Sequence, residues 1–159
     1  MTDRPVFLTD EQDLDVDVDD LCSLARYVLD DRGVPATMEV TLLLVDEPTM
    51  TELNSTHMGA EGPTDVLAFP IDDPAEAPGD PDGDDEVPQA ILGDVVLCPA
   101  VAVAQASELG RQGRDELRLL TVHGLLHLLG MDHAEPGEER EMFALTDRLL
   151  AAHAATVGR

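Results

Sequence analysis

Hydrophobic positions along the chain follow two periods, one typical of buried strands and the other of helices with one apolar face. Short runs of β-branched and aliphatic residues predict four strands, at residues 5–8, 38–45, 65–71 and 91–98. Helical spacing of aliphatic residues predicts five helices, at residues 19–33, 46–57, 99–109, 114–129 and 136–155. Asp19 or Asp20 is expected to cap the first helix and Asp46 the second, because a carboxylate there accepts a free backbone N–H.

These elements predict an α+β protein, in which a small sheet of about four strands is packed by about five helices. The helix at residues 114–129 is apolar nearly all round in its C-terminal half, which predicts a buried central position. With 159 residues, the chain is expected to form one domain, 1–159, with a sizeable core. The exception is the segment 72–88, whose eight acidic residues and several prolines predict a disordered loop.

Three of the five histidines fall within the eleven residues from His123 to His133, which read His-Gly-Leu-Leu-His-Leu-Leu-Gly-Met-Asp-His. Residues four apart lie on one face of a helix, so His123 and His127 are expected to present two imidazoles to one ion. Gly130 tolerates the left-handed conformation that ends a helix, and the turn would return His133 as a third ligand. Three such ligands and an open position are typical of catalytic zinc, so the sequence predicts one Zn²⁺ per chain. Imidazoles also suit Ni²⁺, Cu²⁺ or Fe²⁺.

This spacing equals that of the long zincin motif, but Gly124 stands where those metalloproteases carry a glutamate base. The zincin-like histidine site therefore argues against peptide hydrolysis. Three aspartates remain as candidate catalytic residues that position water or substrate: Asp65, Asp94 and Asp132. Each also has a structural interpretation, respectively as a cap at a strand start, as a hydrogen-bonded group within an apolar strand, and as a turn residue.

The net charge of the chain bears on whether a nucleic acid can be its partner. The net charge is −25 and all nine basic residues are Arg, which taken alone argues against phosphate binding. Almost half of the acidic residues, however, lie in residues 10–20 and 72–86. The rest of the chain therefore repels phosphate less strongly than the net charge suggests. Three arginines shortly before the histidine motif form either a local basic patch or a solvated helix face: Arg111, Arg114 and Arg118.

Cysteine usage and the N-terminal residues indicate a cytoplasmic protein. Cys22 and Cys98 lie far apart with no Cys-x-x-Cys pairing, which is typical of reduced thiols. Residues 1–20 are acidic and lack the apolar stretch of a signal peptide, and no apolar run approaches the length of a membrane span. With one Tyr, three Phe and no Trp, the chain offers few aromatic rings on which RNA bases could stack.

Four sequence blocks, taken in order, resemble the bacterial YbeY family of metal-dependent endoribonucleases. They are Leu53-Asn54, the octet Pro-Thr-Asp-Val-Leu-Ala-Phe-Pro at 63–70, Leu-Gly-Asp-Val at 92–95, and the histidine motif at 123–133. The resemblance implies a single-domain α+β fold with zinc on His123, His127 and His133. It further implies cleavage of single-stranded RNA in the maturation of the 3′ end of small-subunit ribosomal RNA and in ribosome quality control. Ribosomal RNA and the small ribosomal subunit are then the expected partners, with neither DNA nor a membrane.

Three positions depart from the pattern of this family. Met58 stands where the family often has Arg, Ala60 where it has Lys, and Ala68 where it has Ser. The resemblance implies that this Arg lines the substrate cleft, so Met58 weakens that form of phosphate handling. A non-catalytic ribosome-assembly factor with a structural zinc is therefore the alternative function, and a hydrolase of a peptide or small ester ranks third. Asn54 and Thr64 are expected to fix loops.

Overall fold

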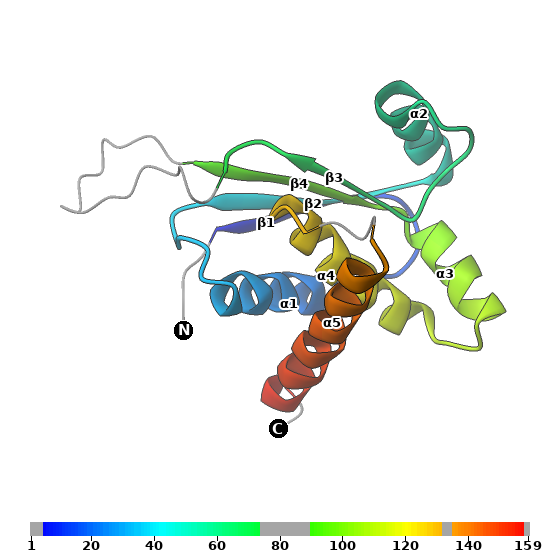
Figure 1. The fold of residues 1–159 in the computed structure, drawn as a ribbon. Coiled ribbons are helices and arrows are strands. Elements are labelled where there is room, and N and C mark those ends of the chain that lie inside the picture. Colours follow the sequence, from blue (N-terminus) through cyan, green and yellow to red (C-terminus); the bar gives the residue numbers. More distant parts are fainter. Residues whose placement is uncertain (1–4, 74–89, 132–134, 158–159) are drawn as a thin grey trace.

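A computed structural model describes residues 5–73, 90–131 and 135–157 (Figure 1). The strands are β1 (Val6–Glu11), β2 (Glu39–Val45), β3 (Val66–Pro70) and β4 (Ile91–Leu97). The helices are α1 (Val18–Asp31), α2 (Glu47–Met58), α3 (Pro99–Glu108), α4 (Gly113–Leu128) and α5 (Pro136–Val157). The predicted α+β class, with four strands and five helices in the described ranges, is confirmed.

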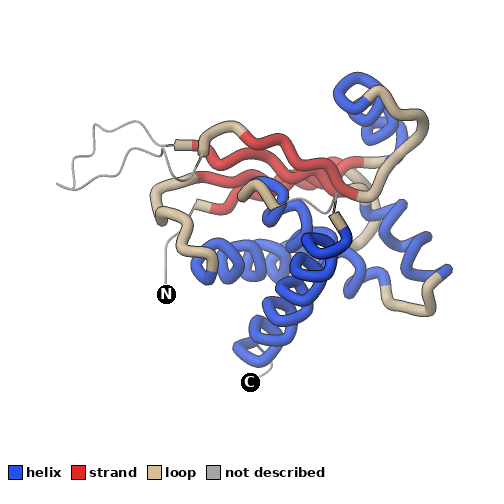
Figure 2. Tube along the Cα trace, in the orientation of Figure 1, coloured by secondary structure: helices blue, strands red, loops and turns tan. Residues whose placement is uncertain are grey.

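The four strands form one mixed sheet in the order β1-β2-β4-β3. β1, β2 and β4 run parallel, whereas β3 pairs with β4 in the antiparallel sense and forms one edge. Parallel neighbours need a crossover connection, and α1 supplies it between β1 and β2. Figures 1 and 2 show α1, α4 and α5 beneath one face of this sheet, with α2 on the other side.

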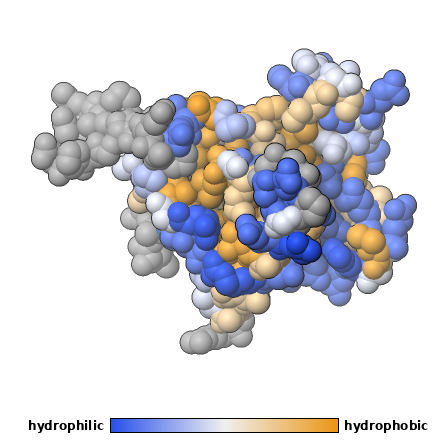
Figure 3. Space-filling model, viewed as in Figure 1, coloured by the Kyte–Doolittle hydropathy of each residue, from blue (hydrophilic) through white to orange (hydrophobic). Residues whose placement is uncertain are grey.

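The alternation of side chains along the strands separates two hydrophobic clusters. The larger cluster joins Val40, Leu42 and Val95 to α1 and α4, and Figure 3 shows hydrophobic side chains between the sheet and these helices. The smaller cluster lies on the opposite face, where Met50 of α2 packs with Val96. Since α4 contacts β3, β4, α1, α3 and α5, the predicted central position of this helix is confirmed.

The helix ends follow local signals in most cases. Asp46 accepts a backbone N–H in the first turn of α2 at 2.9 Å, as predicted. The prediction for α1 was wrong, because Asp17 is the cap and accepts the backbone N–H of Asp20 at 3.1 Å. Asp19 and Asp20 lie in the first turn, where their charge favours the helix dipole. Gly130 follows α4 with φ of 87°, which confirms the predicted helix end.

Most of the predicted acidic loop at 72–88 lies outside the described residues, but its first two residues are described. The backbone pairing of β3 with β4 continues beyond β3, since the N–H of Asp72 donates to the carbonyl of Ile91 at 2.9 Å. The Oδ2 of Asp72 in turn accepts the N–H of Ile91 at 2.8 Å. Asp72 therefore extends the sheet edge. In the ranges that the structure describes, no helix has both the length and the apolar character needed to cross a membrane.

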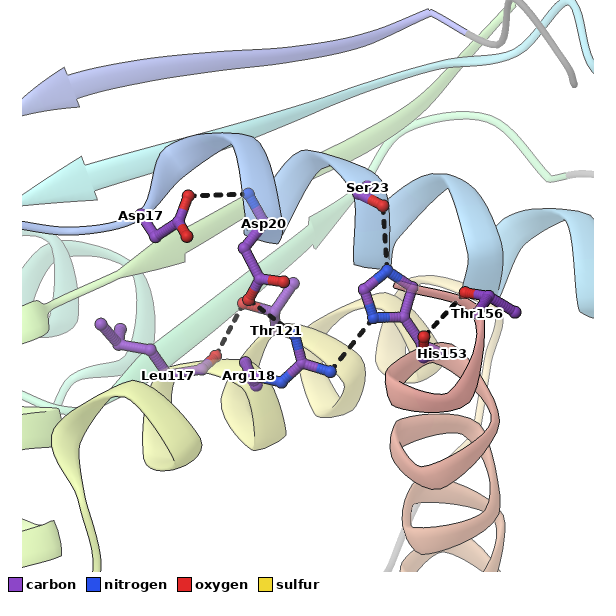
Figure 4. Close-up of polar contacts among 8 residues, drawn as sticks. All are labelled: Asp17, Asp20, Ser23, Leu117, Arg118, Thr121, His153 and Thr156. Carbon is purple, nitrogen blue, oxygen red and sulfur yellow. Dashed lines mark hydrogen bonds and ion pairs between the residues drawn. The ribbon is translucent and has the colours of Figure 1, made fainter. Parts of the chain in front are cut away.

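A buried polar network joins α1, α4 and α5 (Figure 4). Nη1 of Arg118 lies 2.6 Å from Oδ2 of Asp20, and both side chains are only 10% exposed. Nη2 of Arg118 lies 3.1 Å from Nδ1 of His153. The other ring nitrogen of His153, Nε2, lies 2.9 Å from the Oγ of Ser23. A guanidinium only donates, so Nδ1 accepts and the ring proton is assigned to Nε2, where it donates to Ser23. His153 is thus a structural residue that docks α5.

The network predicts a pH dependence of stability. Burial lowers the pKa of His153 and the nearby Arg118 lowers this pKa further, while Asp20 opposes them. A histidine with a lowered folded pKa binds its proton more readily in the unfolded chain, so its contribution to stability is lost as pH falls below about 6.5. We expect the free energy of unfolding to fall as the pH drops below about 6.5 and to fall less in His153→Gln. Urea unfolding at a series of pH values tests this, and equal slopes in the two proteins would contradict it.

Candidate active site

His123 and His127 lie one helical turn apart in the C-terminal half of α4, as the sequence spacing predicts. Both side chains are partly buried, and Nε2 of His123 is shielded from solvent. The third predicted ligand, His133, and the candidate Asp132 lie outside the described residues. Among residues 5–73, 90–131 and 135–157, no group of three His, Cys, Asp or Glu side chains is arranged to hold a metal. The structure thus describes the histidine pair, and the three-ligand site stays a prediction.

A cleft of about 400 Å³ opens beside His127. One wall is the end of α4 and the residues after it, up to Gly130, and the other is the segment Pro70–Asp73 at the end of β3. The hydrogen bond from the N–H of Ile91 to Asp72 holds this second wall against β4. The cleft therefore joins an imidazole to an acidic rim that carries two carboxylates.

Gly124 faces the sheet. A Cβ atom at this position would lie 2.5 Å from Cγ1 of Val95 and 3.2 Å from Cγ2 of Val66. The missing side chain therefore lets α4 lie directly on β3 and β4, which brings the histidine pair close to the sheet. A glutamate would not fit here, so the position that carries the base in zincins serves packing in this chain.

The added methyl group of Gly124→Ala overpacks the contact between α4 and the sheet, which costs about 1–3 kcal/mol. After the gain in helix propensity of about 1 kcal/mol, we expect the free energy of unfolding to fall by up to about 2 kcal/mol. The matched control is Gly137→Ala in α5, where nothing lies within 4 Å of the added Cβ and stability should hold or rise. Urea unfolding compares the two variants. A Gly124→Ala protein as stable as Gly137→Ala would show that the contact is loose.

Asp65 lies just before β3 and makes the contacts of a residue that starts a strand. Its Oδ1 accepts the backbone N–H of Val66 at 2.8 Å and the hydroxyl of Thr64 at 3.3 Å. Its carbonyl accepts the backbone N–H of Cys98 at 3.0 Å, next to the end of β4. The structural interpretation of Asp65 therefore accounts for the contacts of this residue, and Thr64 helps to fix the loop as expected.

Asp94 lies on the other face of the sheet from α4. Its neighbour Val95 points to α4 through the close contact at Gly124, and successive residues of a strand point to opposite faces. Asp94 pairs in register with Thr41 and Phe69, away from the histidines. The structure therefore does not bring this candidate to the histidine pair.

The three arginines before the histidine motif do not form one basic patch, so that interpretation was wrong. Arg118 is buried against Asp20 in the polar network. Nη1 of Arg111 lies 3.7 Å from Oε1 of Glu116, and Arg114 is exposed. The patch fails because Arg118 lies on the buried face of α4.

Other predicted residues take structural positions. Nδ2 of Asn54 donates to the carbonyl of Gly62 at 2.9 Å, which fixes the loop after α2 as expected. Met58, at the end of α2, is 55% exposed. Cys22 and Cys98 are free thiols, and burial raises the pKa of each. Both thiols are therefore protonated at neutral pH.

Two features of the site escaped sequence reasoning. The segment Pro70–Asp73 forms a wall of the cleft, although the acidic composition from Asp72 onward indicates a loop. Phe143 of α5 places its ring centroid 5.1 Å from that of His123, at an interplanar angle of 67°. No local pattern signals this contact, because it depends on how α5 crosses α4.

Known proteins resemble this chain over almost its whole length. A family model described as Endoribonuclease YbeY matches residues 7–154. A Salinispora tropica protein named Endoribonuclease YbeY is 53% identical over 154 residues, which cover 96% of this chain and 98% of the relative. An Acidothermus cellulolyticus protein of the same name is 52% identical over 147 residues, covering 92% and 90%.

The fold is also found in a solved structure. The solution structure of a Thermotoga maritima protein matches with a TM-score of 0.62 at 24% identity, covering 95% of this chain and 90% of that one. The α+β fold and the named relatives together define the class, which is that of the RNA-cleaving hydrolases. The chain belongs to the YbeY endoribonuclease family. These relatives carry the name of a nuclease, which favours the enzyme over the non-catalytic assembly factor.

Proposed function

We propose that this protein is a zinc-dependent endoribonuclease that cleaves single-stranded RNA. Its role is the maturation of the 3′ end of small-subunit ribosomal RNA and ribosome quality control, with the small ribosomal subunit as its partner in the cytoplasm. The observation that carries the proposal is the histidine pair, His123 and His127, which lie one helical turn apart in a chain of the YbeY family, with His127 lining a cleft.

The described residues fit zinc in donor type and helical phase. Imidazole nitrogens are common zinc ligands, and residues four apart share one face of a helix. We assign His123 and His127 as two ligands and His133, shortly after the turn at Gly130, as the third. When bound, zinc supplies a coordinated water with a pKa lowered to about 7 and a Lewis acid for a phosphoryl oxygen.

The size of the cleft is compatible with one nucleotide of an unpaired strand. Its volume of about 400 Å³ lies within the range of small-ligand pockets, roughly 300–1,000 Å³, so it suits a nucleotide of a single strand. Single strands expose their bases and thread into such sites, whereas the bases of a duplex are stacked inside it. The chain holds the strand between the end of α4 and Pro70–Asp73.

The residues present are compatible with two nucleophiles. Gly124 packs on Val95, so no carboxylate base follows the first histidine. The substrate's own 2′-OH and a water molecule are the two candidates. Because the cleft rim is acidic and the chain contains no Lys, attraction to phosphate is weak, and we expect the ribosomal particle to supply most of the specificity.

Cleavage of the same ribosomal RNA in two forms tests this function. The zinc-loaded protein is incubated with naked RNA that spans the 3′ end of the small-subunit rRNA, and with precursor small subunits. We expect cuts scattered over the unpaired regions of naked RNA and a defined 3′ end in the particle. Equal cutting of paired and unpaired regions, or no cleavage of either form, would contradict the proposal.

A further inference from the structure

Phe143 is a large apolar side chain that is only partly buried in the protein. It lies near the start of α5 and is 45% exposed. The buried face of α5 is formed by residues at helical spacing: Met142, Thr146, Leu149 and His153. Phe143 lies beside that face, and its ring makes an edge contact with the ring of His123. Exposed apolar residues are common, so exposure alone does not indicate a function for Phe143. Its position beside a proposed zinc ligand does.

The charge of the protein limits how it can hold RNA. The net charge is −25, there is no Lys, and Asp72 and Asp73 border the cleft. Ionic attraction to phosphates is therefore a weak source of affinity here. Stacking of a base on an aromatic ring does not depend on positive charge and accepts any base, because every base has a π-face. An exposed aromatic ring next to the histidine pair supplies this kind of contact.

We propose that Phe143 forms a stacking subsite for the nucleobase next to the phosphodiester bond that is cut. The inference rests on the proposed function, in which a phosphate of the RNA lies at the metal site formed by His123 and His127. The base and the phosphate of one nucleotide are joined through a single ribose. A ring centred 5.1 Å from the ring of His123 therefore lies within reach of the base when the phosphate is at the histidines.

Steady-state cleavage by the zinc-loaded protein tests the subsite. The substrate is a short single-stranded RNA, and an oligomer of the same length with ribose and phosphate but no bases serves as competitive inhibitor. We expect Phe143→Leu to raise the KM for RNA about tenfold, with kcat and the inhibition constant of the base-free oligomer nearly unchanged. Phe143→Trp should keep the KM of the wild type, because tryptophan also offers an aromatic face for stacking.

The matched control is Phe7→Leu. Phe7 is 52% exposed on β1 and pairs with Thr41, on the sheet face away from α4, so all three constants should keep their wild-type values. An unchanged KM in Phe143→Leu, with cleavage intact, would overturn the stacking subsite alone. A loss of zinc with an equal rise in KM and in the inhibition constant would also overturn it, since Phe143 would then only orient His123. Failure of the wild type to cleave RNA would overturn the proposed function as well.

Discussion

Replacing His127 with alanine should remove bound zinc and RNA cleavage together while leaving the fold intact. The side chain is only partly buried and lines the cleft, so its loss leaves the hydrophobic core unchanged. The zinc would lose one of its three proposed ligands. The several kcal/mol of transition-state stabilisation that a metal supplies would be lost with it, so we expect cleavage to fall by roughly 100-fold or more. Zinc analysis, circular dichroism and an RNA cleavage assay on one preparation measure the three properties.

His57→Ala is the matched control for this substitution. His57 lies on α2, where its ring contacts Phe69 at a centroid distance of 5.1 Å on the opposite side of the sheet. This variant should keep zinc and cleavage. A His127→Ala protein that cleaves RNA at the wild-type rate would place the active site elsewhere, and equal losses in both variants would mean a general effect of removing histidine.

Arg118→Met should lower the free energy of unfolding by about 3–5 kcal/mol, because it leaves the buried carboxylate of Asp20 without its cation. His153 loses a hydrogen-bond donor at the same time. The loss is a large part of the stability of a typical domain, about 5–15 kcal/mol. Urea unfolding of the wild type and the variant at neutral pH measures it.

Two further variants separate the buried ion pair from the loss of an arginine. Nη2 of Arg148 lies 3.1 Å from Oδ2 of Asp31, but the two side chains are 55% and 24% exposed. Arg148→Met should therefore cost only about 0–1 kcal/mol. The double variant Asp20→Leu with Arg118→Met should recover most of the loss, since no buried charge is left unpaired. Equal effects of Arg118→Met and Arg148→Met would contradict the account of the network.

The elements of the fold are predictable because their signals are local. The helical spacing from Leu21 to Leu29 and the aliphatic run of β2 lie where the structure has a helix and a strand. The cap of α1 was misplaced by a few residues, because Asp17, Asp19 and Asp20 all offer a suitable carboxylate. The order of the strands and the antiparallel edge strand β3 depend on long-range pairing, which no local pattern contains.

In the candidate site, too, the features set by local spacing are predictable and those set by long-range packing are not. The phase of His123 and His127 follows from their spacing on one helix and is confirmed. Whether Asp65 or Asp94 lies near the histidines depends on which face of the sheet α4 covers. The packing of Gly124 against Val95 shows which face that is. The contact of Phe143 with His123 likewise depends on how two helices cross.

The most direct test of the proposed function is the rate of RNA cleavage as zinc is returned to the zinc-free protein. Single-stranded ribosomal RNA is the substrate, and bound zinc is measured in the same samples. The account predicts no cleavage without zinc and a rate that rises in proportion to bound zinc until each chain holds one ion. Cleavage by the zinc-free protein at the full rate would contradict it.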